Sequence, residues 1–452
     1  MGKSNIKVIP VPRKELTAWW NRLNPDNQAY IKERLGHLVD LIKVDYQPTL
    51  IKALAKFWDS KTLTFDFRGL EITPTLEEYT TIIGVKFDDH IVQPLLGKDS
   101  TIALSKFLHL KITEIEKILK SNSGKFTLSF LYNNYSSLPI EAGLKPARIF
   151  ILAFFAFVLF PTSRTTFDPS IVHVAKQACY RWNYSYMILA ETFLSLSRFQ
   201  FTQKGTFQAS NGLLYMWFTS HIKTFNLRVG CYEISQYIHP LGSFLKCQSS
   251  VEKLSFKDWV KLLGDLEPKQ LRWRLTWPRI LEARITGIDG NPIPLLGCTG
   301  GSAYYPIRVV RQFGMLQEVP PAVYPDNFAF DLPQGRLTKE TKTLYQAKID
   351  LIIHTLKNSP LQDVEWPDYL DEEMNVHRAS KEYIKMFKEY RQSMVEPYVP
   401  DYIVPYLPGV EPYIPEDMGP PPAEEDEDLH VWDLGGSEIV KDALASKRLR
   451  TA

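Results

Sequence analysis

The run IFILAFFAFVLF, residues 149–160, consists entirely of apolar residues, and Pro161 follows it directly. A helix that crosses a membrane needs about 20 apolar residues, so a run of this length is too short to span one. A helix that is apolar on all sides is typically buried inside a large protein, and proline ends such a helix. We therefore predict that residues 149–160 form a helix at the centre of a globular core.

The sequence on either side of this run is rich in helical patterns. Apolar residues recur at helical spacing in four further regions, 26–44, 104–119, 168–196 and 339–356, and an amphipathic helix is predicted over 376–394. Two more helices are expected at 49–57 and within 205–225. Alternation of Leu63, Phe65 and Phe67 with polar residues predicts one short strand. The fold class is therefore mainly α, with a few short strands.

The segment ITPTLEEY, residues 72–79, has the features of a helix start, and two alternatives fit it. Thr73 could cap the helix with Pro74 at its first position, or Thr75 could cap it with Glu78 reaching back to the cap. In either case Gly84 is expected to end the helix.

The body is assigned to residues 1–395, with a loop-rich subregion at about 243–330 where glycine and proline are frequent and a few strands are expected. Residues 396–452 are dense in proline and contain the acidic run 424–428. This composition favours extended polyproline-II conformation and cannot build a core. We predict a disordered, Pro-rich and acidic tail, with a ligand for a proline-reading domain as the alternative to a plain tail.

Charge and cysteine content exclude several classes of protein. The 53 basic and 51 acidic residues leave a net charge of +2, so no global field draws the chain to nucleic acid or membrane. The four cysteines are scattered without a Cys-x-x-Cys pair, which argues against a zinc site or a disulfide framework. No apolar segment precedes residue 12, so no secretory signal is predicted. We expect a soluble, intracellular protein without a membrane partner.

Known catalytic and cofactor motifs are not found in this sequence. The run 297–302, GCTGGS, is glycine-rich but lacks the lysine of a phosphate-binding loop, so a tight turn is predicted. His173 and His221 lie in apolar stretches and are interpreted as hydrogen-bonded core histidines, whereas His90 is assigned to a polar loop. We assign no catalytic, cofactor-binding or metal-binding residue, and we expect no cofactor.

A short basic and aromatic segment is the candidate for contact with nucleic acid. Arginine pairs with phosphate and tryptophan stacks on unpaired bases. The candidate residues, to which Arg181, Arg308 and Arg311 could add, are Arg272, Trp273, Arg274, Trp277 and Arg279. The alternative is an amphipathic strand whose arginines meet acidic residues of the same protein.

Several strings taken together resemble a plant family of uncharacterised proteins related to the plant mobile domain, also labelled "aminotransferase-like". They lie in order between about residues 10 and 395: 57–59, 65–67, 72–79, 151–161, 294–297, 305–306 and 310–314. The resemblance implies an association with transposable elements and a nuclear role in gene regulation. It implies no catalytic residues, and no lysine stands in a recognisable pyridoxal-phosphate context.

Three functional hypotheses follow. The first is a non-enzymatic interaction module of transposable-element origin that acts in nuclear gene regulation or in element biology, through unidentified protein partners and, as a further option, nucleic acid. The second is an enzyme acting on nucleic acid or phosphoesters, whose site is assembled by the fold. The third is a self-assembling, capsid-like structural protein. The sequence does not predict an oligomeric state.

Overall fold

The computed structural model describes residues 5–84, 90–202, 204–223, 240–275, 282–283, 292–313, 315–320, 328–333, 337–359, 361–363 and 379–393. The mainly helical fold class is confirmed for this part of the chain. The predicted tail, 396–452, lies outside the described residues.

The helices are α1 (Arg13–Arg22), α2 (Pro25–Leu35), α3 (Pro48–Leu54), α4 (Leu76–Ile83), α5 (Ser100–Leu108), α6 (Ile112–Ser121), α7 (Leu128–Tyr135), α8 (Lys145–Phe154), α9 (Ile171–Cys179), α10 (Ser185–Thr202), α11 (Asn211–His221), α12 (Pro240–Cys247), α13 (Phe256–Gly264), α14 (Lys339–Asn358) and α15 (Lys381–Ser393). The longer 3-10 and π segments are Gly36–Lys43, Phe155–Leu159 and Val310–Phe313.

The strands are short and form small separate sheets. They are β1 (Asn5–Val8), β2 (Trp58–Asp59), β3 (Thr64–Asp66), β4 (Glu71–Ile72), β5 (Phe126–Thr127), β6 (Thr166–Phe167), β7 (Lys204–Phe207), β8 (Glu282–Ala283), β9 (Ile293–Leu296), β10 (Gly300–Tyr304), β11 (Phe330–Asp331) and β12 (Gln362–Asp363). Strands β1 and β7 pair in parallel, whereas β2–β3–β4, β9–β10–β11, β5–β6 and β8–β12 are antiparallel.

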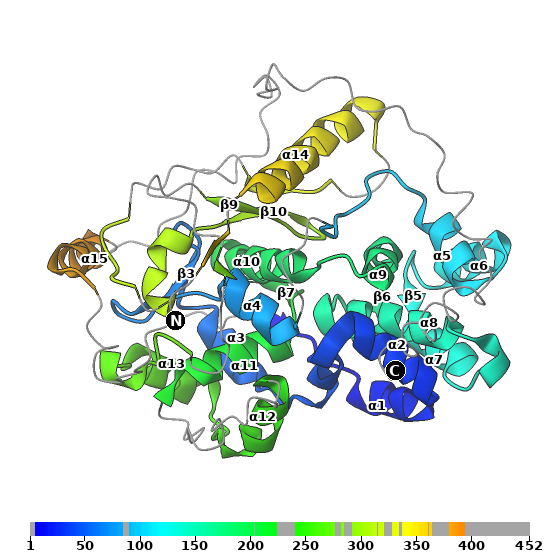
Figure 1. Ribbon diagram of the computed structural model, residues 1–452, viewed down its shortest axis with the longest axis horizontal. Coiled ribbons are helices and arrows are strands. Elements are labelled where there is room, and N and C mark those ends of the chain that lie inside the picture. The colour runs from blue at the N-terminus through cyan, green and yellow to red at the C-terminus, as the bar shows by residue number, and fades with distance from the viewer. Residues whose placement is uncertain are drawn as a thin grey trace, which may run out of the picture.

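The apolar run 149–160 forms the core helix that its composition predicts. Helix α8 covers its first part, and a π-helical turn over Phe155–Leu159 continues it almost to Pro161. All twelve residues are at most 6% exposed. Helices α2, α7 and α9 pack against α8, and together they form one half of the body (Figure 1).

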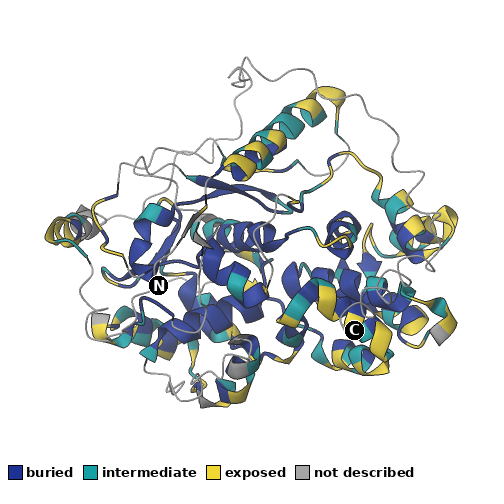
Figure 2. Ribbon diagram, viewed as in Figure 1, coloured by how far each residue is buried: buried dark blue, intermediate teal, exposed yellow. Residues whose placement is uncertain are grey.

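A layered arrangement forms the other half. The β9–β10 hairpin contacts α10 through both of its strands and contacts α14 through β9. Figure 1 shows the hairpin lying between these two helices, with α4 beneath α10. Residues 185–193 of α10 are all buried, and Figure 2 shows α10 as one of the dark helices at the centre, together with α8 and α11. Helix α10 is therefore central to this half.

The structure divides two of the predicted helices. The stretch 26–44 breaks at Gly36, which has a left-handed φ of 55° and leads into a 3-10 segment. A Cβ at this position would lie 3.1 Å from the carbonyl oxygen of Ile83, so the close approach of α4 favours glycine here. The stretch 104–119 breaks at His109, whose φ is also 55°.

Other predicted boundaries shift. Within 205–225 a strand, β7, precedes the expected helix, and residues 224–225 lie outside the described part. The region 243–330, expected to hold loops and a few strands, also contains α13, whose Trp259 and Leu263 are buried. Helix α15 matches the later part of the pattern predicted for 376–394.

One hydrophobic cluster extends from Ile6 to Leu356 and joins the two halves of the body. Figure 2 shows dark buried helices at the centre, with exposed outer faces on α6, α14 and α15. Among the helices in the described ranges, none combines the length and the apolar character that crossing a bilayer requires.

Candidate functional site: a buried carboxylate network

Three glutamates at the start of α4 and in the strand before it lie inside the protein. Glu71, Glu77 and Glu78 are each 1% exposed. Burying a charged carboxylate costs free energy unless hydrogen-bond donors or cations surround it. Their partners therefore show what this cluster does.

The start of α4 forms as the second sequence alternative predicts. The backbone N–H of Glu78 donates to Oγ1 of Thr75, and the backbone N–H of Thr75 donates to Oε2 of Glu78, both at 3.1 Å. This is a complete capping box. Gly84 ends the helix with a left-handed φ of 78°. Local sequence thus places the Glu78 carboxylate at the positive end of the helix.

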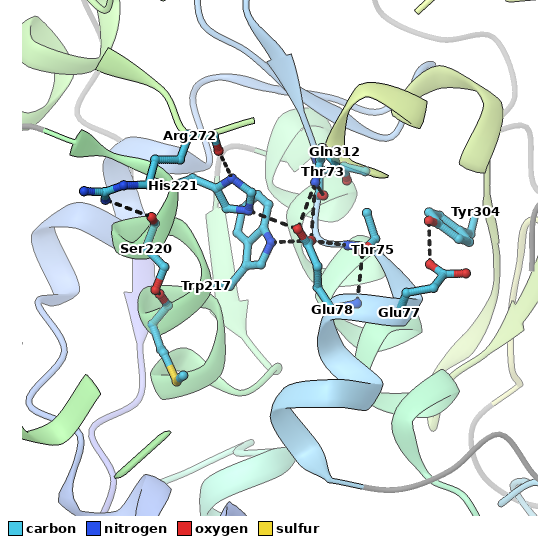
Figure 3. Close-up of polar contacts among 11 residues, drawn as sticks. Thr73, Thr75, Glu77, Glu78, Trp217, Ser220, His221, Arg272, Tyr304 and Gln312 are labelled. Carbon is cyan, nitrogen blue, oxygen red and sulfur yellow. Dashed lines mark hydrogen bonds and ion pairs between the residues drawn. The ribbon is translucent and has the colours of Figure 1, made fainter. Parts of the chain in front are cut away.

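Residues from two distant segments also bind the Glu78 carboxylate. Nε1–H of Trp217, on α11, donates to Oε2 at 2.8 Å. The side-chain amide of Gln312 contacts both oxygens, at 3.3 and 3.4 Å, and also donates to the carbonyl of Thr73. Figure 3 shows these groups converging on Glu78 from both sides. The network therefore ties α4 to α11 and to the segment around 312.

His221 extends the network toward the predicted nucleic-acid segment. Its Nδ1 lies 2.6 Å from the carbonyl oxygen of Arg272, which can only accept, so Nδ1 carries a proton. Its Nε2 lies 3.2 Å from Oε1 of Glu78, an ion-pair distance without the alignment of a hydrogen bond. His221 is fully buried. The prediction of a hydrogen-bonded core histidine is confirmed.

Glu77 faces Tyr304 on β10. The phenolic hydroxyl donates to Oε2 of Glu77 at 2.9 Å (Figure 3). Burial, reinforced by the neighbouring Glu77 carboxylate, raises the pKa of Tyr304 well above its ordinary value. Tyr304 therefore stays a neutral hydrogen-bond donor rather than a proton acceptor.

Glu71 has the most cationic surroundings. Its Oε1 accepts from Nε of Arg308 at 3.1 Å and from Oγ1 of Thr64 at 2.9 Å. Its Oε2 accepts from the hydroxyl of Tyr383, on α15, at 2.6 Å. Burial alone would lower the pKa of Arg308, but the Glu71 carboxylate raises it above its ordinary value. Burial raises the pKa of Tyr383, and the neighbouring Glu71 carboxylate raises it further.

Arg311 completes this end of the network. One of its terminal nitrogens donates to the backbone carbonyl of Glu71 at 2.7 Å. Its guanidinium lies 3.4 Å from the ring centre of Trp273. The expectation that Arg308 and Arg311 add to a basic surface is wrong, because they are 9% and 8% exposed and face Glu71 and Trp273.

The first half of the glycine-rich run, residues 297–299, forms the predicted tight turn between β9 and β10, and residues 300–302 belong to β10. The backbone of this turn wraps around the carboxylate of Glu191, on α10: N–H of Thr299 donates to Oε1 of Glu191 at 2.7 Å, and its hydroxyl lies 2.8 Å from the same oxygen. A Cβ at Gly297 would lie 2.4 Å from this oxygen. The anion that the turn cradles is thus a carboxylate of the protein itself.

The predicted nucleic-acid segment is placed only in part. Trp273 and Arg274 are 3% and 4% exposed, and Arg272 is partly buried and hydrogen-bonded to the backbone of Ser220. Trp277 and Arg279 lie outside the described residues. In this conformation Trp273 and Arg274 are not presented to a ligand. Nucleic-acid binding by the protein stays a prediction.

In this structure a substrate cannot reach the carboxylates of the cluster. Each of the three carboxylates accepts from protein donors and lies out of contact with solvent. Recesses of about 360 and 390 Å³ open elsewhere on the described surface, both lined by Asp45, Gln47 and Lys253. Within the described residues, no group of three or more His, Cys, Asp or Glu side chains could hold a metal ion.

Sequence reasoning did not identify Glu71 and Glu77 as members of a cluster. The available signal was weak: three glutamates close to a helix start are common on protein surfaces. Their partners Tyr304, Arg308 and Tyr383 follow more than 200 residues later, and no local pattern relates them.

Comparison with known proteins gives the family. The model of a family described as "Domain of unknown function (DUF7745)" matches residues 16–346. The chain belongs to this family. No solved structure matches this DUF7745 protein.

Two proteins of Arabidopsis thaliana are similar to this DUF7745 chain. Protein MAIN-LIKE 1 is 23% identical over 316 residues, which are 67% of this chain and 60% of the relative. Protein MAINTENANCE OF MERISTEMS is 24% identical over 304 residues, 61% of this chain and 59% of the relative. The matches thus cover about three fifths of each relative's length. The resemblance to a plant family is confirmed at this distant level, whereas the transposable-element origin stays a prediction.

Proposed function

We propose that this DUF7745 protein is a non-enzymatic interaction module of transposable-element origin that acts in nuclear gene regulation through contacts with other proteins. Its similarity to Protein MAINTENANCE OF MERISTEMS supports a role in meristems. Because the similarity covers about three fifths of that relative, the role belongs to this proposal rather than to the family assignment.

The observation that carries the proposal is the closure of the carboxylate network. A general acid or base must come within hydrogen-bond distance of its substrate. Glu71, Glu77 and Glu78 are instead bound by protein donors and are each 1% exposed. The network therefore supports a structural role: it holds α4, α11, β10 and α15 together, and the outer surface is left for partners.

A conservative substitution separates this proposal from the enzyme alternative. Glu77→Gln keeps an oxygen that accepts from Tyr304 and removes the acid–base group. Plants lacking the gene would receive the tagged wild-type chain or the variant, with nuclear fluorescence and meristem size as readouts. We expect both chains to enter the nucleus and to restore the meristem. A Glu77→Gln chain with an unchanged melting temperature that fails to restore it would favour the enzyme.

Sizing experiments separate the proposal from the capsid-like alternative. An interaction module is expected to elute at a larger mass in nuclear extract than when purified, because partners add to it. Assembly of the purified chain alone that grows with concentration would favour the self-assembling structural protein. Elution of the chain at the same mass in extract and when purified would contradict the proposal.

A further inference from the structure

A continuous row of four aromatic rings joins two partly exposed side chains, one at each end, through the interior of the helical half. The ring centres of Trp20 and Phe150 are 5.7 Å apart, those of Phe150 and Trp19 are 5.6 Å apart, and those of Trp19 and Tyr132 are 6.1 Å apart. Trp19 and Phe150 are fully buried, whereas Trp20 and Tyr132 are partly exposed. The two partly exposed rings are therefore supported from behind by a rigid core.

A cation lies over each of the two partly exposed rings. Nζ of Lys32 is 5.9 Å from the ring centre of Trp20, and Cζ of Arg22 is 5.2 Å from that of Tyr132. Both cations are exposed. Arg22 also donates to two serine hydroxyls, which carry no charge to neutralise it. Among the described residues, neither cation has a carboxylate within ion-pair distance. Their charges are thus available to a ligand that approaches the rings.

These four residues, Trp20, Arg22, Lys32 and Tyr132, are called the cation–aromatic face. They form two pairs, Trp20 with Lys32 and Tyr132 with Arg22. Trp20 and Arg22 are two positions apart on α1 and point to different flanks of this helix, so α1 lies between the two pairs. They come from α1, α2 and α7, which lie together around α8 in the blue and cyan part of Figure 1. Lys145, at the start of α8, lies 5.4 Å from the ring centre of Tyr135 and adds a further positive charge nearby.

Among the described residues, no acidic side chain of these helices forms an ion pair with Arg22 or Lys32; the acidic residues are Glu15, Asp26 and Glu33. Glu33, which follows Lys32 in α2, pairs with Arg34 and Arg181. Asp26 is exposed in the first turn of α2, where the positive end of the helix offsets its charge.

We propose that the cation–aromatic face binds single-stranded nucleic acid. Unpaired bases stack on aromatic side chains, and this contact tolerates any sequence because every base has a flat face. Arginine and lysine contact the phosphates of the backbone. A strand that crosses α1 stacks bases on Trp20 and Tyr132, while the exposed Lys32 and Arg22 side chains move from the rings to the phosphates. A duplex hides its bases within the stack and fits the face less well.

This inference goes beyond the proposed function, which concerns protein partners, and it uses a different part of the surface from the segment 272–279. An acidic protein segment is the competing ligand. It would need the two cations but would gain little from the partly exposed rings, and this difference decides the design of the test.

The test measures binding of the purified full-length chain to labelled single-stranded RNA and DNA of about 20 nucleotides, and to a duplex, by fluorescence anisotropy over a salt series. The variants are Arg22→Gln with Lys32→Gln, Trp20→Ala, and Trp20→Phe. The matched control is Lys257→Gln with Lys261→Gln, which removes two exposed lysines from α13, far from the face in Figure 1.

We expect single strands to bind more tightly than the duplex. The Arg22/Lys32 variant should lose roughly tenfold in affinity, and its salt slope should fall by about 1.4, because two phosphate contacts are removed. Trp20→Ala should lose roughly tenfold with an unchanged slope, whereas Trp20→Phe should retain most of the affinity. Melting temperatures confirm that each variant is folded.

Three results would overturn the proposal. One is failure of the wild-type chain to bind single strands at low salt. Another is an equal loss of affinity in the Lys257/Lys261 control. The third is binding of poly-glutamate that depends on Arg22 and Lys32 together with nucleic-acid binding that is unchanged in Trp20→Ala, which would assign the face to an acidic protein.

Discussion

The hydroxyl of Tyr383 donates a 2.6 Å hydrogen bond to Oε2 of Glu71, across a separation of 312 residues in the chain. Tyr383 is 2% exposed, whereas its neighbours Lys381, Glu382, Ile384 and Lys385 on α15 are exposed. This side chain is therefore a principal attachment of α15 to the body.

Removing that hydroxyl should destabilise the protein. Tyr383→Phe leaves an oxygen of the buried Glu71 carboxylate without its donor, which costs about 1–3 kcal/mol. Denaturant unfolding measures the loss, and hydrogen exchange should show faster exchange in α15. Tyr345→Phe, on the partly exposed face of α14, is the matched control and should have little effect. Equal unfolding free energies for both variants would contradict the attachment.

The Arg308–Glu71 pair should show strong energetic coupling. Arg308→Met removes the cation from a carboxylate that is 1% exposed, and breaking such a pair costs about 3–5 kcal/mol. Adding Glu71→Gln removes the uncompensated charge. The double variant is expected to lose less stability than the sum of the two single variants. Strictly additive losses in a double-mutant cycle would show that the pair is not coupled.

The carboxyl of Glu191 should make stability depend on pH. Burial raises its pKa above the ordinary value of 4.5, although Arg198 and the hydrogen bonds from Thr299 act in the opposite direction. The folded state thus holds this proton more tightly than the unfolded chain. The resulting stabilisation is complete below the ordinary pKa and is lost as the pH rises through the raised one.

Glu191→Gln does not titrate, so its unfolding free energy should rise relative to wild type between about pH 4 and 8. The comparison variant is Glu340→Gln. Hydrogen bonds from the backbone and from Thr338 lower the pKa of this exposed carboxyl, so relative to wild type this variant should lose stability as the pH rises toward the ordinary value of 4.5 and stay level above it. If the unfolding free energy relative to wild type changed in the same direction with pH in both variants, the opposite pKa shifts of Glu191 and Glu340 would be contradicted.

The turn around Glu191 should not tolerate a methyl group. In Gly297→Ala the added Cβ would meet Oε1 of Glu191 at 2.4 Å and Leu194 at 3.1 Å, so the turn must shift, at a cost of about 1–3 kcal/mol. Gly212→Ala is the control. Its Cβ would make ordinary contacts of 3.6 Å or more, and alanine favours the helix α11. In thermal unfolding, the melting temperature of Gly297→Ala should be well below that of Gly212→Ala.

Local features of the sequence predicted local structure well. The Thr75–Glu78 capping box, the ends at Gly84 and Pro161, and the burial of residues 149–160 each depend on residues within a few positions of one another. Hydrophobic spacing likewise predicted α14 almost in full. Such features are determined by helix geometry and by the burial of apolar surface, which act over one or two turns.

Contacts between residues far apart in the sequence decided where a predicted helix breaks and which charged side chains are buried. The break at Gly36 follows from the approach of Ile83, and the glycine alone does not distinguish a helix end from a glycine tolerated inside a helix. Whether an arginine is exposed depends on its partner: Arg308 and Arg311 are buried because Glu71 lies beside them, whereas Arg22 and Lys32 stay on the surface beside Tyr132 and Trp20.

The sequence by itself therefore determined the mainly helical class, the central helix and a capped helix start at either Thr73 or Thr75, between which the structure decided for Thr75. The tertiary structure alone decided which charged and aromatic residues meet, because burial of a charge is favourable only where the fold supplies its partner.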